Sequence, residues 1–275
     1  MENNFSEPPV LLATCLRSPT AEEGYTVTKI TEAGLANPGE ALSQALKELE
    51  AMKSTGPKNV IGVIDIKLKN VRPMFELSGR NYIVIGGLRG IGYAAVRSLC
   101  ELGANVAVLD IQAKSKEVFS SVEDEFNTKV YYFQADVTKL DSLNAGVDKA
   151  IEALGSLDGC LPCAGINCNK PFVDQSWDDF TRIQEINVRG TYFTVQRVVK
   201  QLIKQGTPGS IVMIASQCAH IAIPGCRMSS YNASKGGVLM LTKALRVELA
   251  KHNIRVNSIS PGYIESQMFR DVLAT

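Results

Sequence analysis

From residue 81 onward the chain alternates between short apolar runs and longer amphipathic stretches. The apolar runs are rich in Val and Ile and have the length of strands, and they fall at 82–85, 106–109, 130–133, 159–163, 211–214 and 254–259. The stretches between them repeat their apolar positions with helical spacing, at 90–102, 114–126, 139–154, 178–205 and 231–251. Such alternation is typical of right-handed βαβ units, in which helices cover both faces of a parallel sheet. The pattern therefore predicts a doubly wound α/β domain.

The residues before this domain have a different character. The first forty contain four prolines, three glycines and many small polar residues, and we expect them to be poorly ordered. Apolar positions then repeat with helical spacing over 40–53, and residues 60–68 alternate as a strand would. We therefore expect an N-terminal extension over 1–75, followed by the α/β domain over 76–275.

Composition excludes several classes of protein. The net charge is +1 with acidic and basic residues interspersed, which argues against a nucleic-acid or polybasic membrane-binding surface. No apolar run approaches a membrane span, and no secretory or transit peptide is apparent. The seven cysteines lie mostly in apolar patterns, as in a cytoplasmic protein with reduced thiols. Cys160, Cys163 and Cys168 could suggest zinc, but the first two lie in a strand pattern and the chain has only two histidines, so we expect no metal site.

A glycine-rich segment follows the first predicted strand and runs directly into the first predicted helix. It reads Gly86-Gly87-Leu88-Arg89-Gly90-Ile91-Gly92, with the spacing G-x-x-x-G-x-G. Glycines at such a junction allow a tight turn and let a pyrophosphate approach the backbone, where the N–H groups of the helix N-terminus bind it. Because the spacing differs from G-x-G-x-x-G, the position between strand and helix carries the prediction of a dinucleotide site.

An acidic residue, Asp110, ends the second predicted strand, eighteen positions after Gly92. A carboxylate there can accept a hydrogen bond from a ribose 2′-hydroxyl and repel a 2′-phosphate, which favours NAD(H). Arg89 favours NADP(H) instead, because a guanidinium pairs with a 2′-phosphate. A third interpretation makes Asp110 the N-cap of the following helix. We expect NAD(H), with NADP(H) as the alternative.

Tyr231 and Lys235 lie four residues apart at the start of the last predicted helix, in the segment SSYNASKGGVLMLTKALR. At 3.6 residues per turn this spacing places both side chains on one face. The positive charge of the lysine favours the phenolate, so the phenol can exchange protons nearer neutral pH than its ordinary pKa of about 10. Taken alone, the spacing is a weak signal, because most such pairs in helices are a half-buried tyrosine beside a solvated lysine, and other motifs must decide.

Together these features resemble the short-chain dehydrogenase/reductase superfamily over residues 76–270. The motifs stand in order at successive strand–helix junctions: GGLRGIG at 86–92, Asp110, Ala135-Asp136-Val137, Cys163-Ala164-Gly165-Ile166, Ile186-Asn187-Val188, Ser216, Tyr231-x-x-x-Lys235 and Pro261-Gly262-Tyr263-Ile264. The resemblance implies a Rossmann-like doubly wound sheet and hydride transfer between NAD(P) and an alcohol or ketone.

The resemblance also implies a role for each catalytic residue. Tyr231 would be the general acid for carbonyl reduction or the base for alcohol oxidation. Lys235 would lower the pKa of that tyrosine and hold the nicotinamide ribose. Ser216 would hydrogen-bond the substrate oxygen, and Asn187 would hold a water that connects Lys235 to solvent as a proton relay.

Further expectations from the resemblance concern the cofactor. Asp136 would bind the adenine amine, and the segment after Pro261 would lie against the nicotinamide, with Ile264 and Ser266 near its carboxamide. The expected cofactor-binding residues are Gly86, Leu88, Arg89, Gly90, Ile91, Gly92, Asp110, Asp136, Val137, Ala164, Gly165, Asn187, Tyr231, Lys235, Pro261, Gly262, Ile264 and Ser266.

The chain departs from the pattern of the family in four places. One is the spacing between Ser216 and Tyr231, which is fifteen residues and two more than is common in the family. Ile85 stands where the family usually has a threonine, and Pro162-Cys163 stand where it usually has two asparagines. The chain ends at Thr275, so the last helix and seventh strand of the family, and with them its usual oligomer contact, are expected to be missing. Three interpretations are open: a truncated or mispredicted chain, a weakened or inactive relative, or a rearranged fold in which the predicted helix 40–53 and strand 60–68 take the place of the missing segment. The alternative to such a rearrangement is an unrelated N-terminal extension.

The substrate is expected to be a small alcohol or ketone. The stretch 214–220 and the tail 261–268 resemble fungal sugar- and polyol-type reductases of the family, and ketones of secondary metabolism are the other class considered. Pocket-lining roles are expected for Cys218, Phe172 and Phe269, whereas His220 fits a pocket role and a structural loop role equally.

Two functions follow from the sequence. The intact set of four catalytic residues favours an active cytoplasmic NAD(P)-dependent oxidoreductase that interconverts a secondary alcohol and a ketone. The missing C-terminal segment and the altered strand residues favour a truncated, weakly active or inactive dinucleotide-binding relative. Substrate identity, reaction direction and oligomeric state are left open by the sequence.

Overall fold

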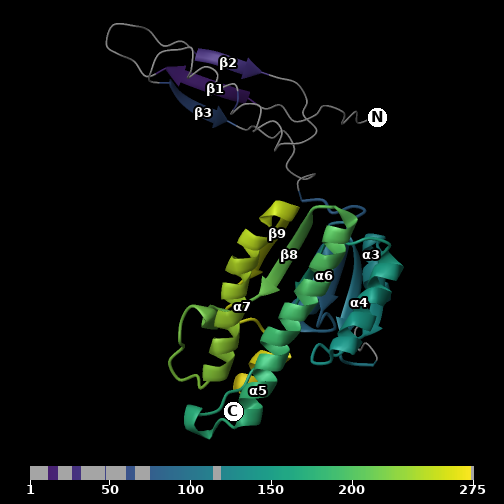
Figure 1. Ribbon diagram of the computed structural model, residues 1–275, viewed down its shortest axis with the longest axis vertical. Helices are drawn as coiled ribbons and strands as arrows, with labels where there is room; N and C mark the ends of the chain where they lie inside the picture. The colour runs from purple at the N-terminus through teal and green to yellow at the C-terminus, as the bar shows by residue number, and fades with distance from the viewer. Residues whose placement is uncertain are drawn as a thin grey trace. The chain divides into compact units, whose positions relative to one another are not determined.

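The computed structural model describes residues 12–17, 27–31, 47, 60–65, 75–113 and 119–273. The chain divides into two compact units, residues 1–76 and 77–275 (Figure 1). The larger unit carries all the motifs that point to a function.

Three strands of the smaller unit form an antiparallel sheet in the order β2-β1-β3. They are β1 (Leu12–Arg17), β2 (Val27–Thr31) and β3 (Val60–Asp65). The strand predicted at 60–68 is confirmed as β3, whereas β1 and β2 were not predicted. These two short runs gain their hydrogen bonds from partners distant in sequence, since Leu12 pairs with both Thr31 and Asp65, and local patterns do not reveal such pairing. The expectation of poor order in the first forty residues stays a prediction. The predicted helix 40–53 lies outside the described residues except for Lys47, which is helical.

The larger unit is built on a six-stranded sheet in the order β6-β5-β4-β7-β8-β9, with every neighbouring pair parallel. Its strands are β4 (Asn81–Ile85), β5 (Asn105–Asp110), β6 (Val130–Gln134), β7 (Gly159–Pro162), β8 (Gly209–Ile214) and β9 (Ile254–Ile259). All six predicted strands are confirmed, and the order is that of a Rossmann-like fold. Strand β3 pairs with β1 in the smaller sheet. The idea that helix 40–53 and strand 60–68 replace the missing last helix and strand stays a prediction, because that helix lies outside the described residues except for Lys47.

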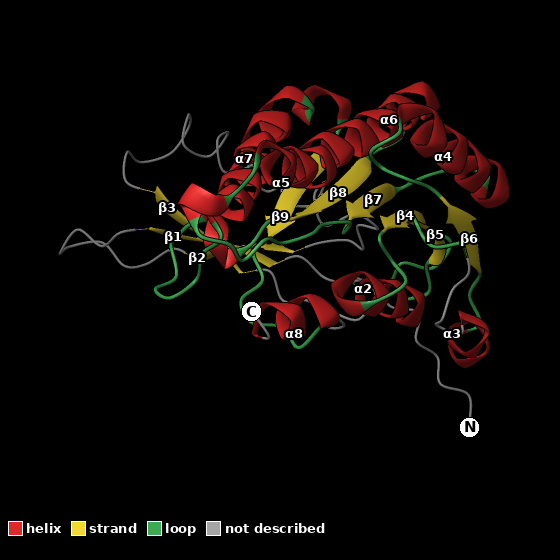
Figure 2. Cartoon of the chain, turned by 90° about the horizontal axis from the view of Figure 1, so that it is seen from below, coloured by secondary structure: helices red, strands yellow, loops and turns green. Residues whose placement is uncertain are grey.

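Helices cover both faces of this sheet. They are α2 (Gly90–Glu101), α3 (Phe119–Phe126), α4 (Leu140–Leu154), α5 (Trp177–Ile183), α6 (Thr191–Gln205), α7 (Ser229–Glu248) and α8 (Gln267–Leu273). Figure 2 shows α4, α5, α6 and α7 on one face and α2, α3 and α8 on the other. The predicted single helix 178–205 is instead two α-helices joined by a π-helical segment, Gln184–Gly190, and α8 was not predicted at all.

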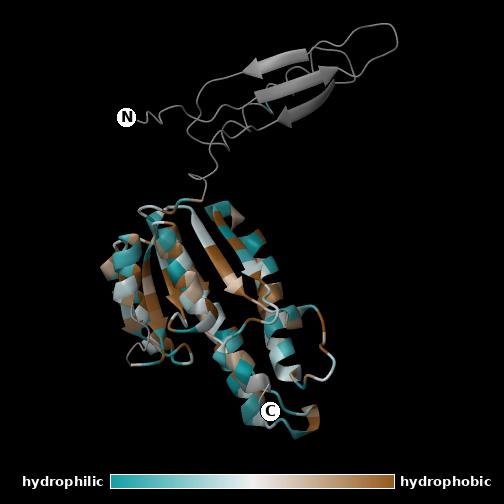
Figure 3. Cartoon of the chain, turned by 180° about the vertical axis from the view of Figure 1, so that it is seen from behind, coloured by the Kyte–Doolittle hydropathy of each residue, from teal (hydrophilic) through white to brown (hydrophobic). Residues whose placement is uncertain are grey.

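The strands form the centre of two hydrophobic layers. Strand β4 is buried at all five positions because helices pack on both of its faces. Ile83 and Ile85 face the layer formed with α4, α6 and α7, whereas Val84 faces the layer formed with α2 and α3. Figure 3 shows the same division, with brown strands between helices that carry both brown and teal.

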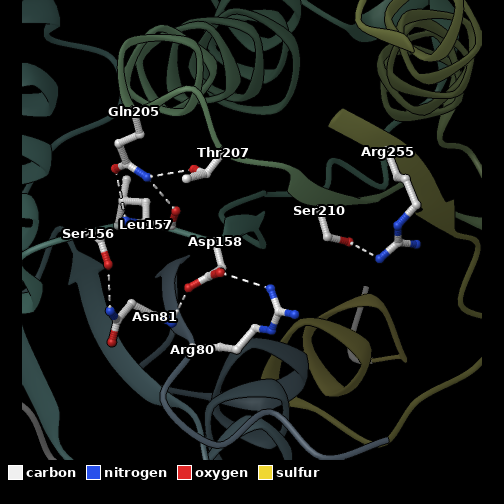
Figure 4. A network of polar contacts seen from close by, with 9 residues as sticks. All are labelled: Arg80, Asn81, Ser156, Leu157, Asp158, Gln205, Thr207, Ser210 and Arg255. Atoms are coloured by element: carbon white, nitrogen blue, oxygen red, sulfur yellow. Dashed lines mark hydrogen bonds and ion pairs between the residues drawn. The ribbon is translucent and has the colours of Figure 1, made fainter. Parts of the chain in front are cut away.

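A polar network ties the strands together at their amino ends (Figure 4). The carboxylate of Asp158 accepts from the backbone N–H of Asn81 at 2.8 Å and from the guanidinium of Arg80 at 3.0 Å. The side-chain amide of Gln205 bonds to both the N–H and the carbonyl of Leu157. The amino ends are thus held by side chains. The carboxyl ends of the strands, where the order of strand addition reverses between β4 and β7, are left for ligand-binding loops.

Candidate active site

Tyr231 and Lys235 lie in the first two turns of α7, on the face turned toward the end of β8. The Nζ atom of Lys235 lies 5.7 Å from the centroid of the Tyr231 ring and donates a 2.8 Å hydrogen bond to the carbonyl of Ile214. Lys235 is only 6% exposed. The predicted pairing of the two side chains on one helix face is therefore observed, with the amine buried rather than solvated.

Burial changes the acidity of both groups. It lowers the pKa of Lys235 from 10.5 to about 8, because a buried ammonium loses its hydration. Burial also raises the pKa of Tyr231, and the hydrogen bond with Ser216 lowers it only in part. Lys235 was expected to lower the pKa of Tyr231, and this structure does not show that effect. The Nζ atom is 5.7 Å from the ring and points its hydrogen bond at Ile214, so the Ser216 hydroxyl is the group that favours the phenolate.

Ser216 lies two residues after β8 and is almost fully buried. Its Oγ accepts from the backbone N–H of Cys218 at 3.1 Å, which fixes the side chain at the start of a short 3-10 helix, Gln217–Ala219. The same side chain acts as a hydrogen-bond partner of the Tyr231 phenol and lowers its pKa. Two hydroxyl groups from separate elements therefore meet at one point, as needed to bind a single substrate oxygen.

Asn187 lies in the π-helical segment and is fully buried. Its Oδ1 accepts from the N–H of Ile166 at 2.9 Å, and its Nδ2 donates to the carbonyl of Ile166 and to the Oγ of Ser234, both at 3.0 Å. Both amide protons are therefore used to join the loop after β7 to helix α7. The proton relay expected at Asn187 stays a prediction, and a water held there would have to be bound by other donors.

At two glycines of the glycine-rich loop, Gly86 and Gly92, the packing leaves no room for a side chain. A Cβ on Gly86 would lie 2.7 Å from the backbone nitrogen of Ala164, and φ at Gly86 is +74°. A Cβ on Gly92 would lie 2.1 Å from the carbonyl oxygen of Gly86. The first turn of α2 has no side-chain cap from Arg89, so its N–H groups can meet an anion. Leu88 is buried in the core, which leaves its backbone as the part that can contact a cofactor.

Asp110 ends β5 and is 9% exposed. Its carboxylate accepts from the backbone N–H of Leu88 at 3.4 Å and from that of Gln112 at 3.3 Å. The first contact joins Asp110 to the glycine-rich loop, where a ribose beside the pyrophosphate would lie. The second forms a turn with Gln112, and α3 is described only from Phe119, so the structure shows no helix cap at Asp110.

Asp136 lies at the carboxyl end of β6 with its carboxylate oriented by neighbours. It accepts from the N–H of Thr138 at 2.9 Å and from the hydroxyl of Thr138 at 2.7 Å, and Lys139 lies 3.7 Å away. Burial acts to raise the pKa of Asp136, but these contacts outweigh it and the pKa is lowered. Val137 follows it, beside Gly190 of the π-helical segment. A contact of Asp136 with adenine stays a prediction.

The loops after β7 and β9 complete the edge of the site. A Cβ on Gly165 would lie 3.3 Å from Asn187 Oδ1 and 3.7 Å from Lys235 Nζ. The N–H of Gln217 donates to the carbonyl of Pro261 at 3.0 Å. On the far side, Ser266 lies 3.7 Å from the Cβ position of Gly90, so the segment after β9 reaches the glycine-rich loop. Two other residues predicted to bind the cofactor follow β9: Gly262 lies beside the amide of Gln217, and Ile264 is exposed. A third, Ile91, is half-buried in α2.

Other residues singled out from the sequence have less to do with the site. His220 bonds to Ser260 at 3.0 Å, which favours its structural role. Phe172 is largely exposed, and Cys218 is buried. The described residues contain no cluster of three His, Cys, Asp or Glu side chains that could hold a metal ion, and none of their helices is long and apolar enough to cross a membrane.

The sequence did not predict the contacts that support the predicted catalytic residues Asn187 and Lys235. Ser234 bonds Asn187, and burial raises the pKa of the Cys163 thiol to about 12 next to Lys235. The only sequence signals were the serine within the Tyr231–Lys235 segment and the cysteine in place of asparagine. The glycine-rich loop, the acid at the end of β5 and the paired hydroxyls together define a dinucleotide-dependent alcohol or carbonyl oxidoreductase.

Comparison with known proteins identifies the family. The profile described as short chain dehydrogenase matches residues 80–275. A 2,5-dichloro-2,5-cyclohexadiene-1,4-diol dehydrogenase of Sphingobium indicum is 34% identical over 198 residues, which are 72% of this chain and 77% of that protein. The 5-keto-D-gluconate 5-reductase of Escherichia coli is 30% identical over 198 residues, 71% of this chain and 76% of that protein. A solved short-chain type dehydrogenase/reductase from Mycobacterium marinum is 35% identical with a TM-score of 0.70, over 74% of this chain and 81% of that chain.

The chain therefore belongs to the short-chain dehydrogenase/reductase family, as the sequence motifs predicted. It is an oxidoreductase that acts on CH–OH groups or the corresponding carbonyls with NAD(P).

Proposed function

We propose that this protein interconverts a secondary alcohol and a ketone with NAD(H) as the preferred cofactor and Tyr231 as the general acid or base. The observation that carries the proposal is the grouping of three side chains: Ser216 lowers the pKa of Tyr231 as a hydrogen-bond partner, and the buried amine of Lys235 lies 5.7 Å from the centroid of the Tyr231 ring. Two hydroxyls at one point can hold a substrate oxygen and exchange a proton with it, and this is the chemistry that a ketone–alcohol conversion requires.

The residues around the glycine-rich loop fit a dinucleotide. Side chains are excluded at Gly86 and Gly92, the N-terminus of α2 lacks a side-chain cap, and Asp110 lies next to the loop. When bound, the nicotinamide supplies or accepts the hydride. Asp110 supports NAD(H) over NADP(H), because its carboxylate would accept from a 2′-hydroxyl and repel a 2′-phosphate.

The chain's own residues then act on the substrate oxygen. Ser216, fixed by the N–H of Cys218, orients that oxygen and stabilises negative charge on it. Tyr231 donates its phenolic proton to the oxygen during reduction and takes the proton back during oxidation. Lys235 lies close enough to Gly165 and Asn187 to bind a ribose hydroxyl in the same region. Asn187 holds the loop after β7 against α7 and so keeps these groups in place.

For the substrate we propose a hydroxylated six-carbon ketone of the sugar or polyol type. The two relatives described above act, by their names, on a cyclohexadiene diol and a ketogluconate. The side chain of Gln217, next to Ser216, lies beside Gly262 and offers an amide to a polar substrate. A carbonyl compound of secondary metabolism is the other candidate. Six cysteines are free thiols, namely Cys100, Cys160, Cys163, Cys168, Cys218 and Cys226, and the cytoplasm stays the predicted compartment.

A binding and turnover experiment tests this function. Fluorescence titration with NADH and NADPH should show binding, with NADH bound more tightly. A panel of ketohexoses, ketogluconates, cyclic diketones and polyketide-type ketones should then reveal oxidation of NADH, strongest with hydroxylated six-carbon ketones. Binding without turnover on any substrate would leave a dinucleotide-binding protein without catalysis, and a tighter NADPH complex would refute the role of Asp110.

A further inference from the structure

The backbone segment that carries Asp110 is held by side chains of the neighbouring strand. Gln134 Nε2 donates to the carbonyl of Ile111 at 3.0 Å, and the Tyr132 hydroxyl donates to the carbonyl of Gln112. Strands β5 and β6 are parallel, with Val108 beside Tyr132 and Asp110 beside Gln134. Because paired residues of neighbouring strands point to the same face, Tyr132, Gln134 and Asp110 share one side of the sheet.

The contacts that Asp110 makes itself are weak by comparison. Its two hydrogen bonds, to the N–H groups of Leu88 and Gln112, measure 3.4 and 3.3 Å, which is longer than usual for an N–H donor. A carboxylate held in this way keeps lone pairs for a ligand, but its direction depends on the path of residues 110–112. The backbone N–H of Ala135 holds the carbonyl of Asp110 at 2.8 Å, and the side chains of Tyr132 and Gln134 hold the two carbonyls that follow. The path past Asp110 therefore depends on these two side chains, and it leaves Ile111 62% exposed.

The protonation state of Tyr132 suits this role. Burial raises its pKa, and the nearby charge of Asp110 raises it further. The phenol therefore stays a hydrogen-bond donor throughout the neutral pH range. Gln134 is exposed at its position on β6. Its amide is therefore not needed to fill the core, and its bond to Ile111 is the contact that the structure shows for it.

We propose that Tyr132 and Gln134 are positioning residues that set the preference for NADH over NADPH by holding Asp110 at the ribose 2′ position. The inference rests on the proposed function, in which Asp110 accepts from that ribose. Neither residue needs to touch the cofactor. Coulomb repulsion between a carboxylate and a 2′-phosphate falls with distance, and so does the hydrogen bond to a 2′-hydroxyl. A loosened segment should therefore weaken NADH binding and relieve the repulsion of NADPH at the same time.

These opposite changes separate positioning from a general loss of stability. A variant that is merely destabilised would bind both dinucleotides more weakly, in parallel. A variant that has lost the position of Asp110 would change the ratio of the two dissociation constants. The ratio of the NADPH to the NADH dissociation constant is therefore the quantity to measure.

The test uses the full-length chain with Tyr132→Phe, Gln134→Leu and the double variant, titrated with NADH and with NADPH. We expect the ratio of the NADPH to the NADH dissociation constant to fall about threefold to tenfold in each single variant, because each substitution removes about one hydrogen bond. The ratio should fall further in the double variant. Tyr131→Phe is the matched control, because Tyr131 lies next to Tyr132 on β6 but packs against the opposite hydrophobic layer. Its ratio should not change.

An unchanged ratio in Gln134→Leu and Tyr132→Phe, or a parallel weakening of both dinucleotides, would overturn the inference. Gln134→Leu keeps the test valid if Tyr132→Phe fails to fold, since Gln134 is exposed. Asp110→Ala separates this inference from the proposed function. If it removes the NADH preference while the β6 variants do not, only the positioning role fails. If the unmodified protein has no NADH preference, the role of Asp110 fails and the inference with it.

Discussion

We predict that the buried charge of Lys235 lowers the free energy of unfolding, although the residue is needed for turnover. Its side chain is almost fully buried on α7, and its amine bonds only a backbone carbonyl in the described structure, that of Ile214. Replacing it with methionine keeps the length and removes the charge. We expect Lys235→Met to be more stable than the unmodified protein at pH 7, and to lose turnover because the amine beside Tyr231 is gone.

The pKa of Lys235 sets the size of this effect. Burial lowers that pKa from 10.5 to about 8. One pKa unit corresponds to ~1.4 kcal/mol, so holding the charge at pH 7 costs the folded protein on the order of 3 kcal/mol. The lost hydrogen bond to Ile214 offsets about 1 kcal/mol of the gain. The free energy of unfolding of Lys235→Met should therefore exceed that of the unmodified protein by about 2 kcal/mol at pH 7.

The pH dependence gives a sharper test than the absolute value. The folded-state pKa of Lys235 lies below its unfolded-state value, so the unfolded chain binds more protons between about pH 8 and pH 10.5. The stability of the unmodified protein therefore gains a contribution as pH rises through this window, and the variant gains none. The stability of the variant relative to the unmodified protein should therefore fall by about 2.5 kcal/mol from pH 7 to pH 10, so that its advantage of about 2 kcal/mol at pH 7 is gone at pH 10.

Urea unfolding of both proteins at pH 7, 8, 9 and 10, followed by tryptophan fluorescence and circular dichroism, measures this difference. The exposed Lys243 of the same helix provides a control for the substitution itself, because Lys243→Met removes a lysine that stays in contact with water. A stability difference that stays constant from pH 7 to pH 10 would refute the argument that Lys235 is a buried charge.

Three further predictions concern the cofactor site and the N-terminal unit. Asp110→Ala should narrow the gap between NADH and NADPH affinity, measured by fluorescence titration, and an equal preference before mutation would mean that Arg89 decides the cofactor. Gly92→Ala should abolish dinucleotide binding in a folded protein, because its Cβ would lie 2.1 Å from the carbonyl oxygen of Gly86, and unchanged affinity would exclude this loop as the site. Removing residues 1–70 should leave the melting temperature of the larger unit unchanged, since among the described strands β1, β2 and β3 pair only with one another, and loss of soluble protein would contradict this.

The sheet and its motifs could be predicted from sequence because their signals are local. Strands buried on both faces, such as β4, read as continuous apolar runs, and each motif lies at the junction that follows its strand. The smaller sheet could not be predicted, because β1 gains its partners only through pairing with residues such as Thr31 and Asp65. The π-helical segment was missed because apolar spacing continues through 178–205 and does not report the local hydrogen-bond pattern.

The same distinction holds within the active site. The residue types at Ser216, Tyr231 and Lys235 were visible in the sequence, but the direction of the Tyr231 pKa was not. That direction depends on burial and on where the amine of Lys235 points, which only the packing of α7 against β8 determines. The hydrogen bonds from Tyr132 and Gln134 to residues 111 and 112 likewise depend on the register of β5 and β6.

The most direct test of the account is the turnover of Tyr231→Phe. The substitution removes only the hydroxyl that meets Ser216, so NADH affinity should be nearly unchanged, and the variant should stay folded. Loss of general acid–base catalysis should lower kcat with the best carbonyl substrate by about 100-fold or more. Steady-state oxidation of NADH, with the dissociation constant measured on the same sample, provides both numbers. A variant that binds NADH normally and keeps more than about a tenth of the activity would contradict the role of Tyr231 as the proton donor.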